Sequence, residues 1–239
     1  MERPLVSIVM PVYNSEAFVA EALDSALAQD YEPFELIAVD DGSTDRSAAI
    51  VQSYPNVHYI LQENSGPSAA RNVGIEASRG EILAFVDADD VVPANKLSVQ
   101  VGYLLEHPDA VCVLGRQHWI NPPEGLARDP VWGDLDGIPL MSMVVRRSVM
   151  LEIGGYAPEV LGPDGRYRAT DLELLVRLRE YGYEHVVLPE IVLHRRHHGG
   201  NLVAGHGLGP LPAASLKQKL DRERARRAAL AQPQEQEQA

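Results

Sequence analysis

The sequence predicts an α/β protein built on a doubly wound, mostly parallel β-sheet flanked by helices. In about the first hundred residues, short apolar runs alternate with helix-like segments, which is typical of this class. The run 82–86 has five consecutive apolar residues, the pattern of a strand buried on both faces. Three of these runs end in polar or acidic clusters, and such folds bind ligands where their strands end. We therefore expect a binding site at the carboxyl edge of the sheet.

Capping and breaking residues set the expected elements of the first half. Pro11 should stop the first strand, and the Asn14-Ser15 pair should cap the first helix. Ser43 or Thr44 should cap the second helix, and Pro93 should open the fourth. The expected strands are 5–10, 34–39, 57–61 and 82–86, and the expected helices are 16–28, 44–51, 68–77 and one beginning at 93.

Beyond residue 111 the pattern is looser. Two segments rich in Pro, Gly and Asp, 121–137 and 157–169, should be loops. The charged segment 215–231 should form a helix, either solvated or offering a basic face to a membrane or partner, and 232–239 should be a disordered tail. We also expect a strand at 141–145, helices at 147–153 and 170–181, and an extended segment at 186–193.

The charge of the chain argues against nucleic acid as a partner. Its formal net charge is −13, from 21 Lys and Arg against 34 Asp and Glu, whereas binding to nucleic acid needs a basic surface. Cys112 is the single cysteine, so neither an intrachain disulfide nor a cysteine-based zinc site is expected. We expect no signal peptide and no membrane span. The expected location is cytoplasmic, with peripheral attachment to a membrane left open.

An acidic cluster indicates a metal site. Asp87, Asp89 and Asp90 directly follow the buried run 82–86. Carboxylates crowded at a buried strand end repel one another and resist the loss of water. A divalent cation would relieve this conflict, because hard cations take carboxylate oxygens as ligands. The alternative is helix capping, which accounts well for Asp45 but not for the three carboxylates together.

The usual glycine-rich phosphate loops are absent from the sequence. Neither G-x-G-x-x-G after the first strand nor G-x-x-x-x-G-K-[ST] occurs, so a bound nucleotide would need a metal to hold its diphosphate. Arg71 is a candidate contact for the base or a phosphate. The alternative for Arg71 is an ordinary arginine on the surface of a helix.

Four segments together resemble family 2 glycosyltransferases of the GT-A fold. They are 7–14 (SIVMPVYN), 39–45 (VDDGSTD), 64–74 (NSGPSAARNVG) and 85–90 (FVDADD). The resemblance is strong over about the first hundred residues and weaker to about residue 202. It implies an inverting transferase that uses a nucleotide-diphosphate sugar, with UDP favoured, and Mn²⁺ or Mg²⁺. It also implies one Rossmann-like GT-A domain, 1–209, with a nucleotide-sugar half (1–115) and an acceptor half (116–209), followed by a tail (210–239).

The resemblance also assigns the donor site. Asp87-Ala88-Asp89 matches the D-x-D motif of the family, whose last Asp usually binds the metal and whose first lies near the ribose. The contacts with the nucleotide are expected from Pro11, Val12, Tyr13, Asp40, Asp41, Arg71, Asp87, Ala88 and Asp89.

Asp171 is the candidate catalytic base. It lies in the first turn of the helix expected at 170–181, where Thr170 and Glu173 form a capping box and an acidic residue favours the helix dipole. Capping is thus a complete structural explanation. The functional alternative is that Asp171 takes the proton of the acceptor hydroxyl. Family 2 enzymes commonly carry Glu-Asp here, so Asp171 matches the family while Thr170 departs from it.

A basic cluster at 194–202 supplies a second candidate metal ligand. It resembles the R-x-H element of the family, with Arg196 and His198 in the two matching positions and His197 as a competitor. Imidazole can complete a metal shell, and arginine can hold a diphosphate. The alternative is a solvated basic loop.

These observations favour transfer of one sugar at a time to an acceptor hydroxyl. The acceptor could be a saccharide, a lipid-linked molecule or a small molecule. The Q-x-x-R-W motif of processive synthases is absent. Two alternatives stay open: a sugar nucleotidyltransferase, and an inactive nucleotide-binding module of the same fold. The first would want a glycine-rich basic loop where this chain has Pro11-Val12-Tyr13-Asn14.

Overall fold

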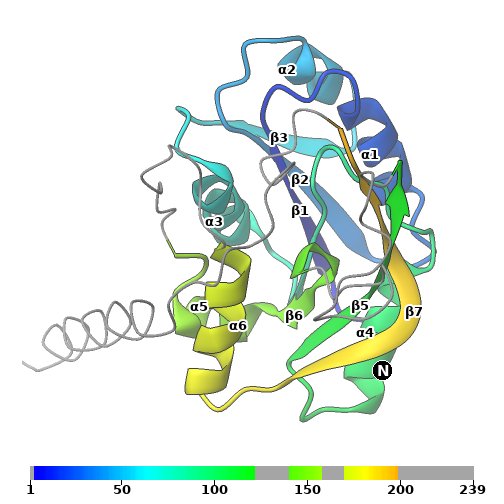
Figure 1. The fold of residues 1–239 in the computed structure, drawn as a ribbon, viewed down its shortest axis with the longest axis vertical. Coiled ribbons are helices and arrows are strands. Elements are labelled where there is room, and N and C mark those ends of the chain that lie inside the picture. The colour runs from blue at the N-terminus through cyan, green and yellow to red at the C-terminus, as the bar shows by residue number, and fades with distance from the viewer. Residues whose placement is uncertain (1–2, 122–139, 158–169, 199–239) are drawn as a thin grey trace, which may run out of the picture. The chain divides into compact units, whose positions relative to one another are not determined.

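The strands form one mixed sheet. The structure is a computed structural model that describes residues 3–121, 140–157 and 170–198. The chain divides into two units, 1–202 and 203–239, and all described residues belong to the first. Within them, seven strands pair in the order β3-β2-β1-β4-β6-β5-β7 (Figure 1). The strands are β1 (Val6–Val12), β2 (Phe34–Asp40), β3 (Val57–Leu61), β4 (Ile82–Phe85), β5 (Cys112–Ile120), β6 (Val144–Arg146) and β7 (His185–Arg196).

The pairing brings the carboxyl ends of β1, β2, β3 and β4 to one edge. β1 lies between β2 and β4 and is parallel to both, with Val6 opposite Phe34 on one side and Ile82 on the other. β3 continues the parallel arrangement beyond β2. β6 is antiparallel to β4 and β5, while β7 is parallel to β5. The predicted α/β fold with a mostly parallel sheet is confirmed.

Helices cover both faces of the sheet. Leu36 and Ala38 of β2 belong to the large core cluster that includes α1, whereas Ile37 and Val39 pack with Ala70 of α3. Because neighbouring residues of a strand point to opposite faces, α1 and α3 lie on opposite sides of the sheet (Figure 1). The helices are α1 (Val19–Leu27), α2 (Ser47–Gln52), α3 (Pro67–Ala77), α4 (Lys96–Glu106), α5 (Arg147–Ile153) and α6 (Thr170–Glu180), with a 3₁₀ turn at Leu140–Ser142.

Helix length also bears on membrane crossing. In the described ranges, no helix combines the length and the apolar character that a membrane span requires.

Pro11 does not stop the first strand, contrary to the prediction. β1 continues through Pro11 to Val12, whose carbonyl accepts the amide N–H of Asp41 on the β2 side. The backbone groups of neighbouring residues face opposite sides of a strand, so the nitrogen of Pro11 faces the β4 side. There the ladder has already ended at the pair Val9 and Phe85. The missing N–H of Pro11 therefore falls where the β1–β4 ladder ends, while the pairing of β1 with β2 continues past it.

The first helix begins later than predicted. α1 starts at Val19 rather than near residue 16, and the carbonyl of Ser15 accepts the amide of Val19 in the preceding turn. Asn14 does not cap this helix. It has a positive φ of 46°, and its side-chain oxygen accepts the amide N–H of Thr44 at 2.8 Å. Asn14 thus joins the loops that follow β1 and β2.

Two further helix starts were also predicted too early. α2 begins at Ser47, whose amide donates to Asp45 Oδ1 at 2.9 Å. Neither of the proposed caps, Ser43 and Thr44, therefore lies directly before the helix. Ser43 instead accepts the amide N–H of Asn14. α4 begins at Lys96, although the carbonyl of Pro93 accepts the amide of that lysine at 3.0 Å.

The second half contains a strand that the sequence did not predict. β5 carries Arg116, Gln117 and His118 in its outer half and has no apolar run there. Its pairing with β7 is irregular between Leu114 and Gln117. A Cβ on Gly115 would lie 2.5 Å from Val192 Cγ2, so glycine permits the close approach of the two strands. Most of the expected loops, the helix at 215–231 and the tail lie outside the described residues.

A second glycine allows a helix to approach the sheet closely. Gly74 lies within α3, and a Cβ added to it would be 2.3 Å from Cγ1 of Val9 in β1. Any larger residue would push α3 away from β1 or force Val9 to move. Arg71 lies one helical turn before Gly74, so this contact also sets the position of the arginine.

Candidate functional site

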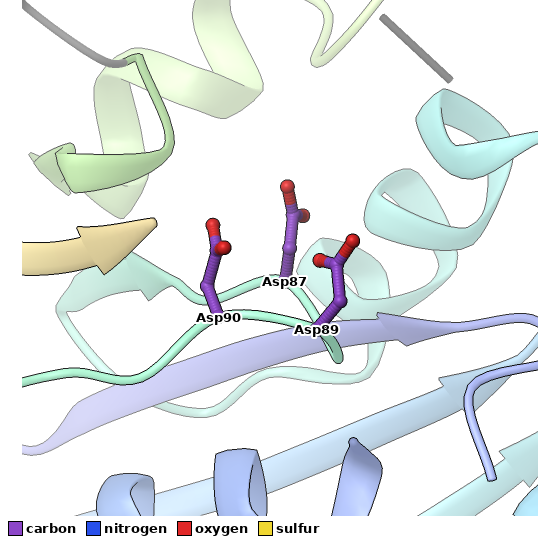
Figure 2. Close-up of side chains that lie close together, drawn as sticks. All are labelled: Asp87, Asp89 and Asp90. Atoms are coloured by element: carbon purple, nitrogen blue, oxygen red, sulfur yellow. The ribbon is translucent and has the colours of Figure 1, made fainter. Parts of the chain in front are cut away.

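The acidic turn after β4 brings three carboxyl groups together. Possible ligand oxygens of Asp87, Asp89 and Asp90 lie within 4.8 Å of one another. Figure 2 shows the three side chains rising to the same side of the turn above the sheet. Asp90 is 3% exposed, whereas the other two are partly exposed. The cluster predicted from the sequence therefore has the geometry of a small group of ligands.

Burial, and then the crowding of negative charges, raises two of these pKa values. Burial and then the charges of Asp87 and Asp89 raise the pKa of Asp90 to about 8. Burial first, and then Asp87, raise the pKa of Asp89, against the opposing effect of His198. A cation bound among the carboxylates would stabilise their charged forms. A donor set of carboxylate oxygens with one imidazole suits Mn²⁺ or Mg²⁺, so the residues present fit the ion that the fold family implies.

Cationic side chains from distant segments surround the acidic turn. Arg71 of α3 donates to Asp87 Oδ1 at 2.7 Å, and its side chain is 6% exposed. Arg196 of β7 donates its backbone N–H to Asp90 Oδ1 at 2.8 Å and its Nε to the carbonyl of Asp89 at 3.1 Å. Arg71 is therefore a buried ion-pair partner rather than a surface arginine.

His198 lies at the acidic turn, as its proposed role as a metal ligand requires. Its Nε2 is 3.0 Å from Asp89 Oδ2. His197 is bound through its backbone N–H to the carbonyl of Ile120 at 3.0 Å. The contact with Asp89 favours His198 over His197 as the residue that could join Asp89 at a metal.

Asp40 and Asp41 lie at the same edge but are buried. Asp40 accepts the amide N–H of Ser43 and the hydroxyl of Tyr59, each at 2.8 Å. Burial and this hydrogen bond raise the pKa of Tyr59 to about 12. Asp40 therefore braces the end of β2, and its contact with a nucleotide base stays a prediction.

Asp41 organises the loop before α3. It accepts Gln62 Nε2 at 2.6 Å and the amides of Ser65 and Gly66 at 2.8 Å each, and it is 2% exposed. Three donors thus occupy its carboxylate. Its predicted role in nucleotide binding would act through the shape of this loop.

The other predicted donor contacts differ in accessibility. Tyr13 is 51% exposed just beyond β1, where its ring is open to a planar ligand. Pro11, Val12 and Ala88 are buried. They can line the floor of a site with backbone and small side chains, and their contacts with a ligand stay predictions.

Asp171 lies in the first turn of α6, as predicted, although the structure describes its backbone and not its side chain. The helix itself is firmly anchored. Arg177 donates to Glu173 Oε2 at 2.8 Å and to the carbonyl of Ile153 in α5 at 3.0 Å. The role of Asp171 as a base stays a prediction.

The contacts of four residues at the site were not predicted from the sequence. Asp90 was visible in the acidic run but was not named as a ligand. Arg196 was matched to the R-x-H element of the family, but its contacts with the acidic turn were not predicted. Phe18 and Glu21, at the start of α1, contact Arg196 at the end of β7 across more than half the chain. No local sequence signal marks these two residues, because their partners lie far along the chain.

Sequence comparison identifies the family. Residues 7–148 match the profile of glycosyl transferase family 2. The chain belongs to this family. It is 39% identical over 112 residues to an uncharacterized glycosyltransferase of Haemophilus influenzae, covering 45% of each protein. It is 32% identical over 160 residues to one of Rickettsia typhi, covering 62% of this chain and 50% of the relative. The chain therefore spans about half the length of these curated relatives.

Structural comparison supports the GT-A fold for this family 2 chain. Residues 1–349 of TarS from S. aureus in complex with UDP-GlcNAc align with a TM-score of 0.69 and 21% identity, over 91% of this chain and 66% of that TarS chain. The mannosyltransferase PcManGT from Pyrobaculum calidifontis in complex with GDP-Man and Mn²⁺ aligns with a TM-score of 0.62 and 22% identity, over 84% of this chain and 59% of that protein. At these identities the likeness establishes the fold alone.

Proposed function

We propose that this protein transfers a single sugar from a nucleotide-diphosphate sugar, with UDP as the favoured nucleotide, to an acceptor hydroxyl with inversion. The observation that carries the proposal is the meeting of Asp87, Asp89, Arg71 and His198 at one edge of the sheet. Family membership and solved relatives bound to UDP-GlcNAc and GDP-Man support a nucleotide-sugar donor.

The donor would lie along the carboxyl edge of β1, β2 and β4. Tyr13 offers an exposed ring on which a base could stack. Asp87, held by Arg71, can accept a hydrogen bond from a ribose hydroxyl. Because Arg71 is buried and already paired, it would act by fixing Asp87 rather than by reaching into solvent for a phosphate.

Asp89, Asp90 and His198 are the residues that would hold a divalent ion. When bound, the ion would neutralise charge that develops on the departing diphosphate. His198 and the backbone of Arg196 hold the acidic turn in place. The Mn²⁺ in the PcManGT complex supports this assignment as a likeness between folds.

Asp171 would activate the acceptor. Its carboxylate would take the proton of the acceptor hydroxyl as the hydroxyl oxygen attacks the anomeric carbon. The new bond forms on the face opposite the departing diphosphate oxygen, so the anomeric configuration inverts. The anchoring of α6 to α5 through Arg177 supports this role, since a base must be held in a fixed position.

The test is a transfer assay with matched variants. The protein would be given UDP-Glc, UDP-Gal, UDP-GlcNAc or GDP-Man with Mn²⁺, and release of the nucleoside diphosphate would be measured with and without candidate acceptors. Asp89→Asn and Asp171→Asn should each lower the rate by about a hundredfold or more. Asp109→Asn changes an exposed aspartate beyond α4 and should not affect the rate.

Two outcomes would contradict the proposal. Sugar transfer at the wild-type rate by both Asp89→Asn and Asp171→Asn would exclude the roles assigned to these two residues. Release of pyrophosphate from UTP and a sugar 1-phosphate, without any release of UDP from UDP-sugars, would identify a nucleotidyltransferase instead.

A further inference from the structure

One aromatic ring at the start of α1 contacts two residues of the site. Phe18 immediately precedes α1 and is half-buried. Its ring centroid lies 4.4 Å from that of His198, with an angle of 31° between the planes. The guanidinium carbon of Arg196 lies 5.3 Å from the same centroid. Arg196 and His198, which both contact the acidic turn, thus both pack on Phe18.

The ring of His198 needs such support because of its place in the chain. β7 ends at Arg196, and the backbone N–H of His197 bonds to Ile120, so His198 follows the last pairing contact. A histidine side chain turns about two bonds. The hydrogen bond to Asp89 directs Nε2, while packing on Phe18 restrains the plane of the ring. Together the two contacts restrain both rotations.

Arg196 connects the same ring to the backbone of the turn. Its Nε donates to the carbonyl of Asp89, and its backbone N–H donates to Asp90. A guanidinium over an aromatic face is stabilised by the electron density of the ring. Arg196 also pairs with Glu21 at 2.6 Å, but Glu21 has a side chain that is 61% exposed, so this ion pair contributes little.

We propose that Phe18 is a positioning residue for the metal site, holding His198 and Arg196 against the acidic turn. This inference rests on the proposed function, because it assigns Asp89 and His198 as ligands. Phe18 acts through His198 and does not itself contact a reacting group. Aromatic replacements should therefore be accepted, and an aliphatic replacement of similar size should loosen the site.

A purely structural role would have a different signature. α1 is anchored by the buried side chains of Val19, Ala22, Leu23 and Ala26, so docking of the helix does not depend on Phe18. Removing the ring should therefore change metal binding more than it changes stability.

The test measures binding of Mn²⁺ alone to the 239-residue chain by titration calorimetry. Phe18→Leu should weaken Mn²⁺ binding about tenfold, the lower end of the effect of residues that orient metal ligands. Phe18→Tyr, which keeps the ring, should restore wild-type affinity. Phe34→Leu makes the same change at a half-buried phenylalanine at the amino end of β2 and should leave affinity unchanged. Phe18→Met serves as the aliphatic replacement if the leucine variant does not fold.

A double-mutant cycle with His198 separates positioning from general destabilisation. In a His198→Ala background, Phe18→Leu should weaken Mn²⁺ binding less than it does in the wild type, because only the support of Arg196 is left to lose. Wild-type affinity in Phe18→Leu, or an equal loss in both backgrounds, would overturn the role of Phe18 and leave the proposed function standing. If the wild-type protein bound no Mn²⁺ yet transferred sugar, the metal site and the role of Phe18 would both fall, while the transferase would remain.

Discussion

Replacing Gly74 with alanine should destabilise the protein even though alanine is the better helix former. Gly74 lies inside α3, where the added Cβ would be 2.3 Å from Val9 Cγ1 and 3.2 Å from Cγ2. Gly102 lies inside α4, where an added Cβ would meet nothing within 4 Å. The same substitution can therefore be made at two helical positions that differ in the space available.

The expected magnitudes follow from two opposing effects. Replacing glycine by alanine inside a helix gains about 1 kcal/mol at either position. At Gly74 the overlap with Val9 resembles an overpacked core, with a cost of about 3 kcal/mol, the upper part of the usual range. Gly74→Ala should therefore lose about 2 kcal/mol overall, while Gly102→Ala should gain about 1 kcal/mol. In a chain of this size, each kcal/mol corresponds to a shift in Tm of about 2–4 °C.

Urea unfolding followed by circular dichroism would measure both variants. A third variant tests the cause directly: Val9→Ala removes the two methyl groups that the new Cβ would meet. The double variant Val9→Ala with Gly74→Ala should lose less stability than the two single changes added together. Binding of UDP-sugars should also weaken in Gly74→Ala, because Arg71 lies one turn earlier on the displaced helix.

Two results would refute this reasoning. One is an unfolding midpoint for Gly74→Ala equal to or above that of Gly102→Ala. The other is strict additivity of the Val9 and Gly74 changes, which would mean that the predicted contact does not limit the approach of α3 to β1.

Three further predictions concern buried charges. Burial lowers the pKa of Lys96 to about 7. Between pH 7 and about 10, the unfolded chain therefore holds a proton that the folded protein has lost. This proton should raise the free energy of unfolding by about 1.4 kcal/mol per pH unit. The difference in stability between the wild type and Lys96→Met should show this rise in urea unfolding at pH 7, 8 and 9, because Asp90, with a pKa of about 8, gives both proteins the same opposing slope; a difference that does not change with pH would contradict the shift. Asp41→Asn should lower the free energy of unfolding in urea by about 1–3 kcal/mol, because an amide oxygen cannot replace a carboxylate that accepts three donors. The exposed control Asp109→Asn should cause no measurable loss. Asp87→Asn should weaken UDP-sugar binding in calorimetry and lower stability, since it removes the ion pair between Asp87 and the buried Arg71; unchanged values for both would exclude a role for this ion pair.

Much of the first half could be predicted because its signals are local. The apolar run 82–86 and the acidic turn after it mark both a buried strand and the edge where the site lies. The start of α3 was predicted at residue 68, one residue late, because Pro67, a good first residue of a helix, begins it. The starts of α1 and α2 were predicted less well. Asn14 and Ser43 have cap-forming side chains but bind each other's loops instead.

The second half depends on contacts that no local pattern encodes. β5 is a strand because β6 and β7 pair with it, although Arg116, Gln117 and His118 interrupt its apolar pattern. The support of His198 by Phe18 links residues at opposite ends of the described chain. For Asp171, the helix expected at 170–181 is present as α6.

The contacts that hold the acidic turn in place affect the order in which the site forms. The contacts of Arg196 and His198 with Asp89 and Asp90 span 106 to 109 residues. Chains are synthesised from the N-terminus, so the turn leaves the ribosome well before the strand that neutralises it. Until β7 docks, these carboxylates lack their contacts with Arg196 and His198. The charge balance of the site is therefore among the last features to form during synthesis, and an isolated N-terminal half would carry the acidic turn without these partners.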